Sequence, residues 1–306
     1  MTVAPASPGA RLRARLATGE LLVLPGAPNA LTARVIEDCG FDAAYVTGAG
    51  VANTFLGVAD IGLLSVGELV DHVAAMAAAV ALPLVVDADT GFGGPLNVAR
   101  TVRSLERAGA AAIQLEDQTF PKRCGHFAGT EVVPRQEMLG KLRAAVDARE
   151  SADLVIVART DARAGHGLDE ACERANGYRE AGADVLFVEA LRSVAEVEEV
   201  PRRVPGPLLV NLVEGGVTPA LPAARLEALG YSIALHANLA LLASVGAMQA
   251  VLGELRASRE VTETRGVLAS WEERQRLVRR QELDDLGARY EPGPAEPGSA
   301  GAGAVP

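Results

Sequence analysis

The sequence predicts a (β/α)8 barrel, also called a TIM barrel, from three observations. Eight short apolar stretches alternate with longer stretches of mixed polarity. Several of the longer stretches end in glycine, which favours the left-handed conformation that closes a helix. The residues capable of chemistry gather where the apolar stretches end, and active sites in such barrels lie at the carboxyl ends of the strands. A doubly wound open sheet is the alternative, but it would spread those residues along a line.

Each apolar stretch has the length of a short buried strand. Hydrophobic residues make up 49% and aromatic residues 4% of the chain, which suits helices packed on a parallel sheet. The expected strands are residues 21–24, 43–47, 84–87, 112–116, 154–159, 185–189, 208–211 and 232–235. The expected helices are residues 11–18, 31–39, 66–81, 97–108, 135–150, 168–181, 194–204, 222–229 and 238–259.

The chain is expected to contain one catalytic domain with short additions at each end. Residues 1–10 and the Pro-, Gly- and Ala-rich residues 291–306 are expected to be disordered. Residues 11–260 are expected to form the barrel. Residues 261–290 are charged and compatible with helix, and a closed barrel does not need them. A helix left over in this way often packs on a partner subunit, so we expect a homo-oligomer.

Composition excludes several kinds of partner. The net charge is −10, from 29 basic and 39 acidic residues, and no basic block occurs, so nucleic acid and anionic membranes are poor partners. Cys39, Cys124 and Cys172 form no C-x-x-C pair, which favours a reducing cytoplasm over a disulfide framework. The longest apolar stretch, residues 74–86, is interrupted by Pro83 and too short to span a bilayer. We therefore expect a soluble protein acting on a small molecule.

Four carboxylates are candidates for a divalent metal site. Asp87 and Asp89 follow the third expected strand two residues apart, so in an extended segment both face the same way. Glu116 ends the next strand, and Asp60 is a fourth candidate. Oxygen ligands without nearby His or Cys fit Mg²⁺ or Mn²⁺ rather than zinc. The alternative is that these acids cap helices or pair with arginine, which would be preferred for a single Asp.

A thiol lies among cations in the segment KRCGH, residues 122–126. This setting lowers a thiol pKa and favours chemistry at Cys124, although a buried cysteine is commonly an inert apolar residue. His126 alone is as well explained by structure as by function. We interpret Cys39 and Cys172, which fall on expected helices, as structural.

Two further features are able to bind a carboxylate. Arg159 ends the fifth strand and can either form a two-pronged hydrogen bond with a substrate carboxylate or serve only as a salt-bridge partner. The glycine-rich turn Thr47–Gly50 offers backbone N–H groups to an anion, although a short turn is a weak signal by itself. It is not a dinucleotide fingerprint, because no G-x-G-x-x-G opens a helix there.

Taken together, these segments resemble the isocitrate lyase and phosphoenolpyruvate mutase superfamily. The resemblance covers about the first 240 residues. Its pieces are Tyr45-Val46-Thr47-Gly48 with Asp60, DADTGFG from Asp87, QLEDQ from Gln114, KRCGH from Lys122, ARTDA from Ala158, FVEA from Phe187 and NLVEGGVTP from Asn211. The resemblance implies a (β/α)8 barrel, usually tetrameric with a C-terminal helix exchanged between subunits, and Mg²⁺-dependent chemistry on 2-oxo acids or their aldol-type adducts.

Within the superfamily, the KRCGH loop is similar to that of carbon-carbon lyases such as the 2-methylisocitrate and 2,3-dimethylmalate lyases. This likeness implies that Mg²⁺ near Asp87, Asp89 and Glu116 holds an α-hydroxy carboxylate, whose cleavage leaves an α-keto acid, pyruvate or glyoxylate, and a second carboxylate. Cys124 would protonate the carbanion. Arg159 and His126 are implied to be catalytic with it, by stabilising carboxylates. The residues implied to bind the substrate are Thr47, Gly48, Ala49, Lys122, Arg123, Gly125, Glu189 and Asn211.

The chain departs from the family pattern near the expected pocket. Thr47 stands where Ser is common, Val58-Ala59-Asp60 replaces Leu-Pro-Asp, and His236-Ala237-Asn238 replaces the Tyr-Pro-Leu of methylisocitrate lyases. These changes favour a smaller substituted malate or oxaloacetate over a tricarboxylate.

Two other activities fit the same residues. A carboxyphosphonoenolpyruvate-type phosphonomutase is one, because some mutases carry the same loop and Cys124 does not separate the two classes. Oxaloacetate decarboxylase or hydrolase is the other, because metal-bound enolpyruvate chemistry is common to all of them. A non-enzymatic barrel is disfavoured, because the acids, cations and thiol are all present.

Overall fold

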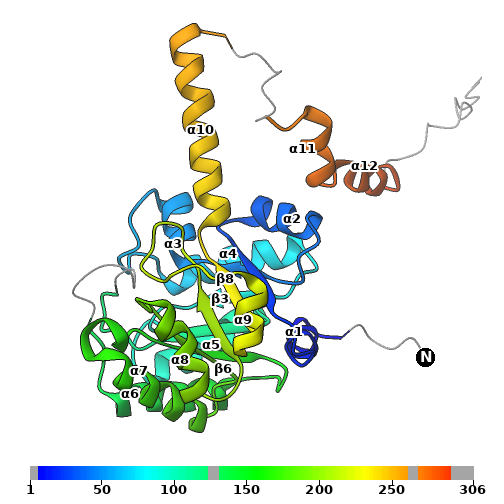
Figure 1. The fold of residues 1–306 in the computed structure, drawn as a ribbon. Coiled ribbons are helices and arrows are strands. Elements are labelled where there is room, and N and C mark those ends of the chain that lie inside the picture. Colours follow the sequence, from blue (N-terminus) through cyan, green and yellow to red (C-terminus); the bar gives the residue numbers. More distant parts are fainter. Residues whose placement is uncertain (1–5, 123–130, 261–267, 291–306) are drawn as a thin grey trace, which may run out of the picture. The chain divides into compact units, whose positions relative to one another are not determined.

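Eight parallel strands close into a barrel in sequence order, as predicted, and the open sheet is excluded. The computed structural model describes residues 6–122, 131–260 and 268–290. Figure 1 shows helices arranged around the strands. The strands are β1 Leu22–Ala27, β2 Ala44–Val46, β3 Leu84–Asp87, β4 Ala112–Glu116, β5 Val155–Thr160, β6 Val185–Val188, β7 Leu208–Asn211 and β8 Ile233–His236.

The predicted helices are present in the predicted order, most with small shifts at their ends, and α3 and η1 were not predicted. They are α1 Pro8–Leu16, α2 Ala30–Asp38, α3 Gly48–Val51, the π-helix η1 Ala52–Leu56, α4 Val66–Ala79, α5 Pro95–Arg107, α6 Arg135–Ala148, α7 Ala162–Glu180, α8 Val194–Arg203, α9 Ala223–Leu229, α10 Leu239–Ser258, α11 Trp271–Leu277 and α12 Arg280–Ala288. The predicted helix 168–181 is the part of α7 beyond a kink at Gly167, where φ is 87°.

Strand alternation divides the side chains into two sets. Inward-facing residues such as Val155 and Val157 of β5 form one apolar cluster inside the barrel. Outward-facing residues such as Ile156 and Ala158 belong to a second cluster that includes buried residues of the surrounding helices. By the same period, Arg159 at the end of β5 turns inward and Thr160 turns outward. The alternation of the strand backbone therefore directs the reactive side chains at the strand ends into the barrel mouth.

The parallel register brings the strand ends together. Glu116 of β4 pairs with Arg159 of β5, and Asp87 of β3 pairs with Gln114 of β4. Residues that are 43 positions apart in the sequence, such as Glu116 and Arg159, thus become neighbours across one ladder.

The first helix begins earlier than predicted. Pro8 occupies its first turn, where a missing N–H costs nothing, and the Ser7 hydroxyl accepts the N–H of Ala10 at 3.0 Å. The prediction that residues 1–10 are disordered is therefore wrong for residues 8–10. Leu12 is buried with the inner cluster, so α1 packs at the end of the barrel away from the mouth.

The chain divides into two compact units, residues 1–261 and 262–306. The described part of the second unit consists of α11 and α12, both within the segment predicted to be helical. The Ser270 hydroxyl caps α11 by accepting the N–H of Glu273 at 3.0 Å. Residues 291–306, for which disorder is predicted, lie outside the described residues.

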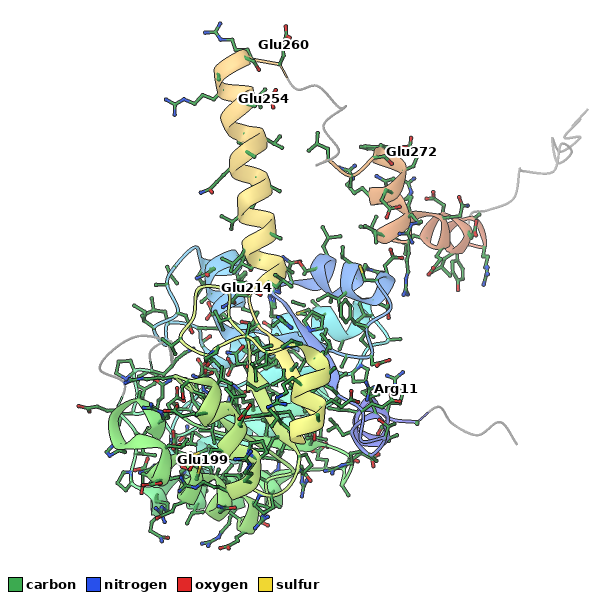
Figure 2. The ribbon with its side chains drawn as sticks, viewed as in Figure 1. Arg11, Glu199, Glu214, Glu254, Glu260 and Glu272 are labelled. Atoms are coloured by element: carbon green, nitrogen blue, oxygen red, sulfur yellow. The ribbon has the colours of Figure 1, made fainter. Side chains whose placement is uncertain are left out.

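Helix α10 is apolar but mostly exposed. Its Leu242, Met248 and Leu252 are 47%, 52% and 59% exposed, and Glu254 is labelled near its end in Figure 2. Within the described ranges, α10 is the one helix long and apolar enough to cross a membrane by length and composition, which is weak evidence for a span. The sequence analysis, which took residues 74–86 as the longest apolar stretch and found it too short to span a bilayer, did not identify this helix. Exchange of a C-terminal helix between subunits stays a prediction.

A tight contact between β1 and the segment after β8 yields a test of the fold. A Cβ at Gly26 would lie 1.8 Å from the carbonyl oxygen of Ala237, whereas a Cβ at Gly67 in α4 would meet nothing within 4 Å. We expect Gly26→Ala to lower the free energy of unfolding by about 3 kcal/mol, and Gly67→Ala to leave it unchanged or raise it by up to about 1 kcal/mol. Urea unfolding measures both, and equal stabilities would contradict the contact.

Candidate active site

A pocket opens at the carboxyl ends of the strands. Nine residues predicted for the site line it: Thr47, Ala49, Asp60, Asp87, Glu116, Lys122, Arg159, Glu189 and Asn211. They come from the ends of β2, β3, β4, β5, β6 and β7 and from the connections that follow. One mouth therefore gathers residues spread over 165 positions of the chain, from Thr47 to Asn211.

Asp87 and Asp89 converge over Gly48. A Cβ at Gly48 would lie 3.2 Å from Asp87 Oδ2 and 3.1 Å from Asp89 Oδ1, so glycine leaves room for both carboxylates. The sequence argument expected this convergence from strand alternation, but Asp89 lies beyond β3 in the left-handed conformation, with φ of 50°. Its N–H donates to Asp87 Oδ1 at 3.2 Å. A bend of the chain, rather than a strand, aims the second carboxylate.

Lys122 lies among these acids. Its ammonium is 2.8 Å from Asp89 Oδ1 and also contacts Asp60. Burial by itself would lower the pKa of Lys122, but Asp89, Glu116 and their neighbours raise it well above its usual value. Burial raises the pKa of Asp89 to about 7 although Lys122 opposes this. Asp60, expected as a metal ligand, is thus the ion-pair partner of Lys122 in this structure.

Arg159, at the end of the next strand from Glu116, is surrounded by three acids. Its Nε and Nη2 donate to Asp161 at 2.9 and 2.7 Å, and its guanidinium nitrogens lie 3.4 Å from Glu116 and 3.5 Å from Glu189. The guanidinium packs 5.3 Å from the ring centre of Phe187. Burial raises the pKa of Glu116 well above its usual value, although Arg159 opposes this.

This arrangement refines the role expected of Arg159. The Nε–Nη2 edge, which would grip a carboxylate in two places, is occupied by Asp161. Nη1 is the guanidinium nitrogen that Asp161 does not bind, and it lies 3.5 Å from Glu189. Asp161 is a partner that sequence reasoning missed, although it lies two residues along in the ARTDA motif.

Glu189 and Asn211 are joined to each other at the wall of the pocket. Asn211 Nδ2 donates to Glu189 Oε2 at 3.3 Å, and the N–H of Ala190 donates to Glu189 Oε1 at 2.8 Å. Ala190 has φ of 58°, so the backbone after β6 is bent in a way that alanine rarely adopts.

The predicted glycine-rich turn is the start of a helix. Thr47 caps α3 by accepting the N–H of Gly50 at 3.3 Å, and η1 continues directly from α3. The N–H groups expected to face an anion thus belong to a helical first turn. Tyr45 of β2, two residues before Thr47, also lines the pocket, and its pKa is raised by burial and then by Asp87.

The pocket also has a largely apolar side, formed by Val213, Leu235, Ala237 and Asn238 at the ends of β7 and β8. Sequence reasoning placed Ala237 and Asn238 near the pocket but did not assign Val213 or Leu235 to it. Leu235 lies two residues from Ile233 on β8, and both belong to the inner cluster. The period of two was therefore a signal for Leu235.

Four of the predicted site residues, Arg123, Cys124, Gly125 and His126, lie outside the described residues. The connection that contains them is anchored at both ends. Gln118 forms an antiparallel bridge with Val132, and the N–H of Thr119 donates to the carbonyl of Glu131 at 2.9 Å. This small ladder was not predicted.

The carboxylates are only partly satisfied by the protein. Among the described residues, Glu116 Oε1 and Asn211 Oδ1 are buried without a hydrogen-bond partner. No group of three or more His, Cys, Asp or Glu side chains in the described ranges forms a ready metal cage.

Known proteins with similar sequences include two lyases and a phosphorylmutase. The chain is 48% identical over 239 residues to 2,3-dimethylmalate lyase of Eubacterium barkeri, covering 78% of this chain and 83% of the relative. It is 45% identical to 2-methylisocitrate lyase of Aeropyrum pernix, covering 81% and 80%. It is 39% identical to the chloroplastic carboxyvinyl-carboxyphosphonate phosphorylmutase of Arabidopsis thaliana, covering 88% and 81%.

Solved structures agree with this grouping. A crystal structure of 2,3-dimethylmalate lyase matches with a TM-score of 0.88 and 34% identity, covering 99% of this chain and 100% of that one. Oxaloacetate acetylhydrolase with 3,3-difluorooxalacetate matches at 0.88 and 35%, covering 93% and 98%. Phosphonopyruvate hydrolase with oxalate and Mg²⁺ matches at 0.85 and 33%, covering 93% and 99%.

The family model described as phosphoenolpyruvate phosphomutase matches residues 12–256, which include the whole barrel and its mouth. The relatives confirm the resemblance predicted from the motifs. This chain belongs to the phosphoenolpyruvate mutase and isocitrate lyase superfamily.

Proposed function

We propose that this protein is a Mg²⁺-dependent carbon-carbon lyase of the cytoplasm. It cleaves a 2-hydroxy di- or tricarboxylate, of the substituted malate or 2-methylisocitrate type, into an α-keto acid and a second carboxylate. The observation that carries the proposal is a single pocket with Asp87 and Glu116 on one side, the Arg159 guanidinium beside them and an apolar wall at Leu235. Such a pocket offers groups for a cation, for a carboxylate and for alkyl carbons.

The carboxylates fit Mg²⁺ better than they fit any ion that needs a full protein cage. Mg²⁺ keeps several waters and takes only one or two carboxylates from the protein. Asp87 and Asp89, which share the space over Gly48, would hold it, and the unpaired Glu116 Oε1 would accept hydrogen bonds from its waters. When bound, the ion would supply Lewis-acid stabilisation of negative charge on substrate oxygens. Mn²⁺ has the same ligand preference.

The chain's own residues would orient the two ends of the substrate. Arg159 would bind a carboxylate through its Nη1 end, while Asp161 keeps the guanidinium from rotating. Val213, Leu235 and Ala237 would contact methyl groups, which favours substituted malates over unsubstituted ones. Cys124, on the evidence of its sequence neighbours, would donate a proton to the carbanion left after cleavage.

Substrate turnover tests the proposed function. Incubation with Mg²⁺ and 2-methylisocitrate, isocitrate, 2,3-dimethylmalate, citramalate or oxaloacetate is expected to release pyruvate or glyoxylate from a substituted substrate and to stop when EDTA is added. Oxalate and acetate formed from oxaloacetate would instead indicate a hydrolase, in line with one structural relative. If no substrate releases a keto acid but the protein forms a phosphonate product, the lyase proposal is wrong and the protein is a mutase.

Cys124 is expected to be needed for turnover. We predict that Cys124→Ser lowers the rate of keto-acid release by about a hundredfold or more, because a hydroxyl is a much weaker acid than a thiol at this point in the reaction. Cys39→Ser is the matched control, since Cys39 is an exposed thiol at the end of α2. A Cys124→Ser enzyme as fast as the control would remove Cys124 from the mechanism.

The space over Gly48 is expected to set the affinity for the metal. In Gly48→Ala the new methyl group would press on Asp87 and Asp89, so we expect Mg²⁺ to bind about tenfold more weakly by calorimetry. Gly140→Ala serves as the control, because a Cβ there meets only Pro95 at 3.8 Å. Identical Mg²⁺ affinities in the two variants would show that these carboxylates do not hold the ion.

A further inference from the structure

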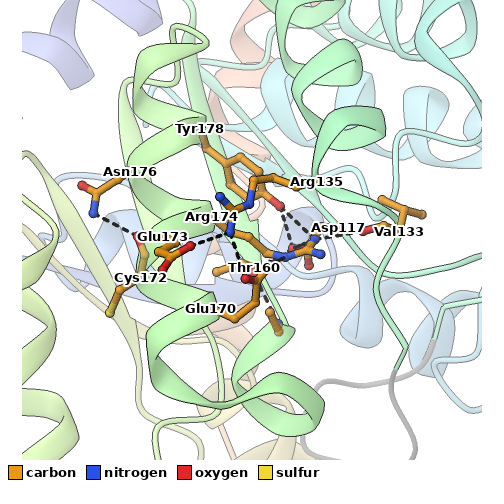
Figure 3. A network of polar contacts seen from close by, with 11 residues as sticks. Asp117, Val133, Arg135, Thr160, Glu170, Cys172, Glu173, Arg174, Asn176 and Tyr178 are labelled. Atoms are coloured by element: carbon orange, nitrogen blue, oxygen red, sulfur yellow. Dashed lines mark hydrogen bonds and ion pairs between the residues drawn. The ribbon is translucent and has the colours of Figure 1, made fainter.

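A second polar cluster lies behind the pocket, on the outer side of β4 and β5. Asp117 is fully buried and does not line the pocket. Its Oδ2 accepts the hydroxyls of Thr160 and Tyr178, each at 2.7 Å, and Arg174 Nη1 at 3.2 Å. Figure 3 shows these groups converging between the strand ends and α7. We refer to Asp117, Thr160, Arg174 and Tyr178 as the Asp117 cluster.

The barrel itself does not require a charge at this position. The preceding outward-facing residues of β4, Ile113 and Leu115, are apolar and pack in the outer core. A buried ionic group is weak evidence for stability, because desolvation offsets much of its attraction. Asp117 is nevertheless supplied with a full set of donors, and this points to a role in fixing geometry.

The cluster reaches Arg159 through Asp161. Asp117 Oδ1 accepts the backbone N–H of Asp161 at 2.9 Å, and the Asp161 carboxylate holds Nε and Nη2 of Arg159. Asp161 stands at the N-cap of α7, where an Asp side chain normally accepts a helix N–H, but here it makes no such bond. An acceptor at Asp117 holds this backbone in place.

The far side of the cluster is tied to the connection after β4. Arg174 Nη1 also donates to the carbonyl of Val133 at 2.9 Å, and its Nε donates to Glu170 at 2.7 Å. The N–H of Val133 in turn donates to the carbonyl of Asp117 at 2.8 Å. Asp117 is therefore held from β5, from α7 and from the connection after β4, so that its carboxylate is a fixed reference for Asp161.

We propose that Asp117 is a positioning residue for Arg159: it fixes the backbone of Asp161, whose carboxylate then holds the guanidinium at the angle that receives a substrate carboxylate. The inference rests on the proposed function, in which Arg159 binds that carboxylate. It assigns to this reaction a residue that never touches the substrate.

Two matched variants test the proposal. Asp117→Asn leaves one oxygen for four donors, so either Asp161 or Arg174 loses its acceptor. Asp184→Asn is the control, because Asp184 accepts the N–H of Ile156, at the other end of β5, at 2.8 Å and pairs with Arg13 and Arg149. We expect Asp117→Asn to lower kcat/KM for keto-acid release about tenfold and Asp184→Asn to leave it unchanged. Equal activity of the two variants would overturn the proposal.

A double-mutant cycle separates positioning from plain stability. If Asp117 acts through Arg159, Asp117→Asn will cause no further loss of kcat/KM in an Arg159→Lys background, although its effect on the melting temperature persists. A full, additive loss of kcat/KM in that background would mean that Asp117 supports only the fold.

If Asp117→Asn does not fold, Tyr178→Phe is used in its place. Tyr231→Phe is its control, because the Tyr231 hydroxyl donates to the carbonyl of Val197 at 2.9 Å and lies outside the site. A wild-type protein without turnover would end the proposed function but not this test. Crystal structures of the variants then decide. Loss of the ion pair between Arg159 and Asp161 in the Asp117 or Tyr178 variant, with the pair kept in the control, supports positioning. An unmoved guanidinium overturns it.

Discussion

The balance of charge at the barrel mouth constrains the rest of the site. Asp87, Asp89, Glu116, Asp161 and Glu189 are all buried there, and the cations buried beside them are Lys122 and Arg159. Burial raises the pKa values of Asp89 and Glu116, and neighbouring acids raise them further, although Lys122 and Arg159 oppose this. Such an excess of negative charge can be neutralised either by protonation of a carboxylate or by binding of a cation. A divalent ion removes the excess without giving up the acids as ligands, which is why the proposed Mg²⁺ fits the electrostatics as well as the oxygen chemistry.

Because strand residues alternate in direction, the charged groups of the mouth lie on the inner side of the barrel and the residues that hold them in place lie on the outer side. At the ends of β4 and β5, Glu116 and Arg159 face the mouth, and Asp117 and Thr160 face the helices. Inward and outward residues thus share a peptide bond. A hydrogen bond made on the outer side, such as that from Asp161 to Asp117, therefore sets the orientation of groups on the inner side. Because the strands pair in parallel register, each strand end is also held in place by the strands on either side of it.

The sequence was sufficient for the strands and for the gathering of their terminal residues. Periodic apolar runs placed β3 and β4 at their observed bounds, and the rule that chemistry lies at strand ends brought Asp87, Glu116 and Arg159 to one pocket. Contacts that depend on loop conformation were not accessible in this way. Neither the pairing of Lys122 with Asp60 nor the left-handed turn at Asp89 follows from a pattern of residues, because both depend on where a loop returns in space.

Local rules failed where the site overrides them. Thr47 and the glycines after it have the composition of a turn, yet they begin α3, because the threonine hydroxyl caps the helix. Asp161 has the position of a capping residue, yet its carboxylate is turned to Arg159.

Backbone strain gathers at the same place. Among the described residues of the barrel strands and their carboxyl-terminal loops, Asp89, Phe92 and Ala190 have positive φ without being glycine. Each such residue costs about 1–3 kcal/mol and persists only where its surroundings hold it. Asp89 is held by the hydrogen bond to Asp87 Oδ1 and the ion pair with Lys122, and Ala190 by the bond from its N–H to Glu189. At Asp89 and Ala190 a charged group of the pocket fixes the bend beside it, so the carboxylates that the proposed chemistry needs also stabilise the backbone that aims them.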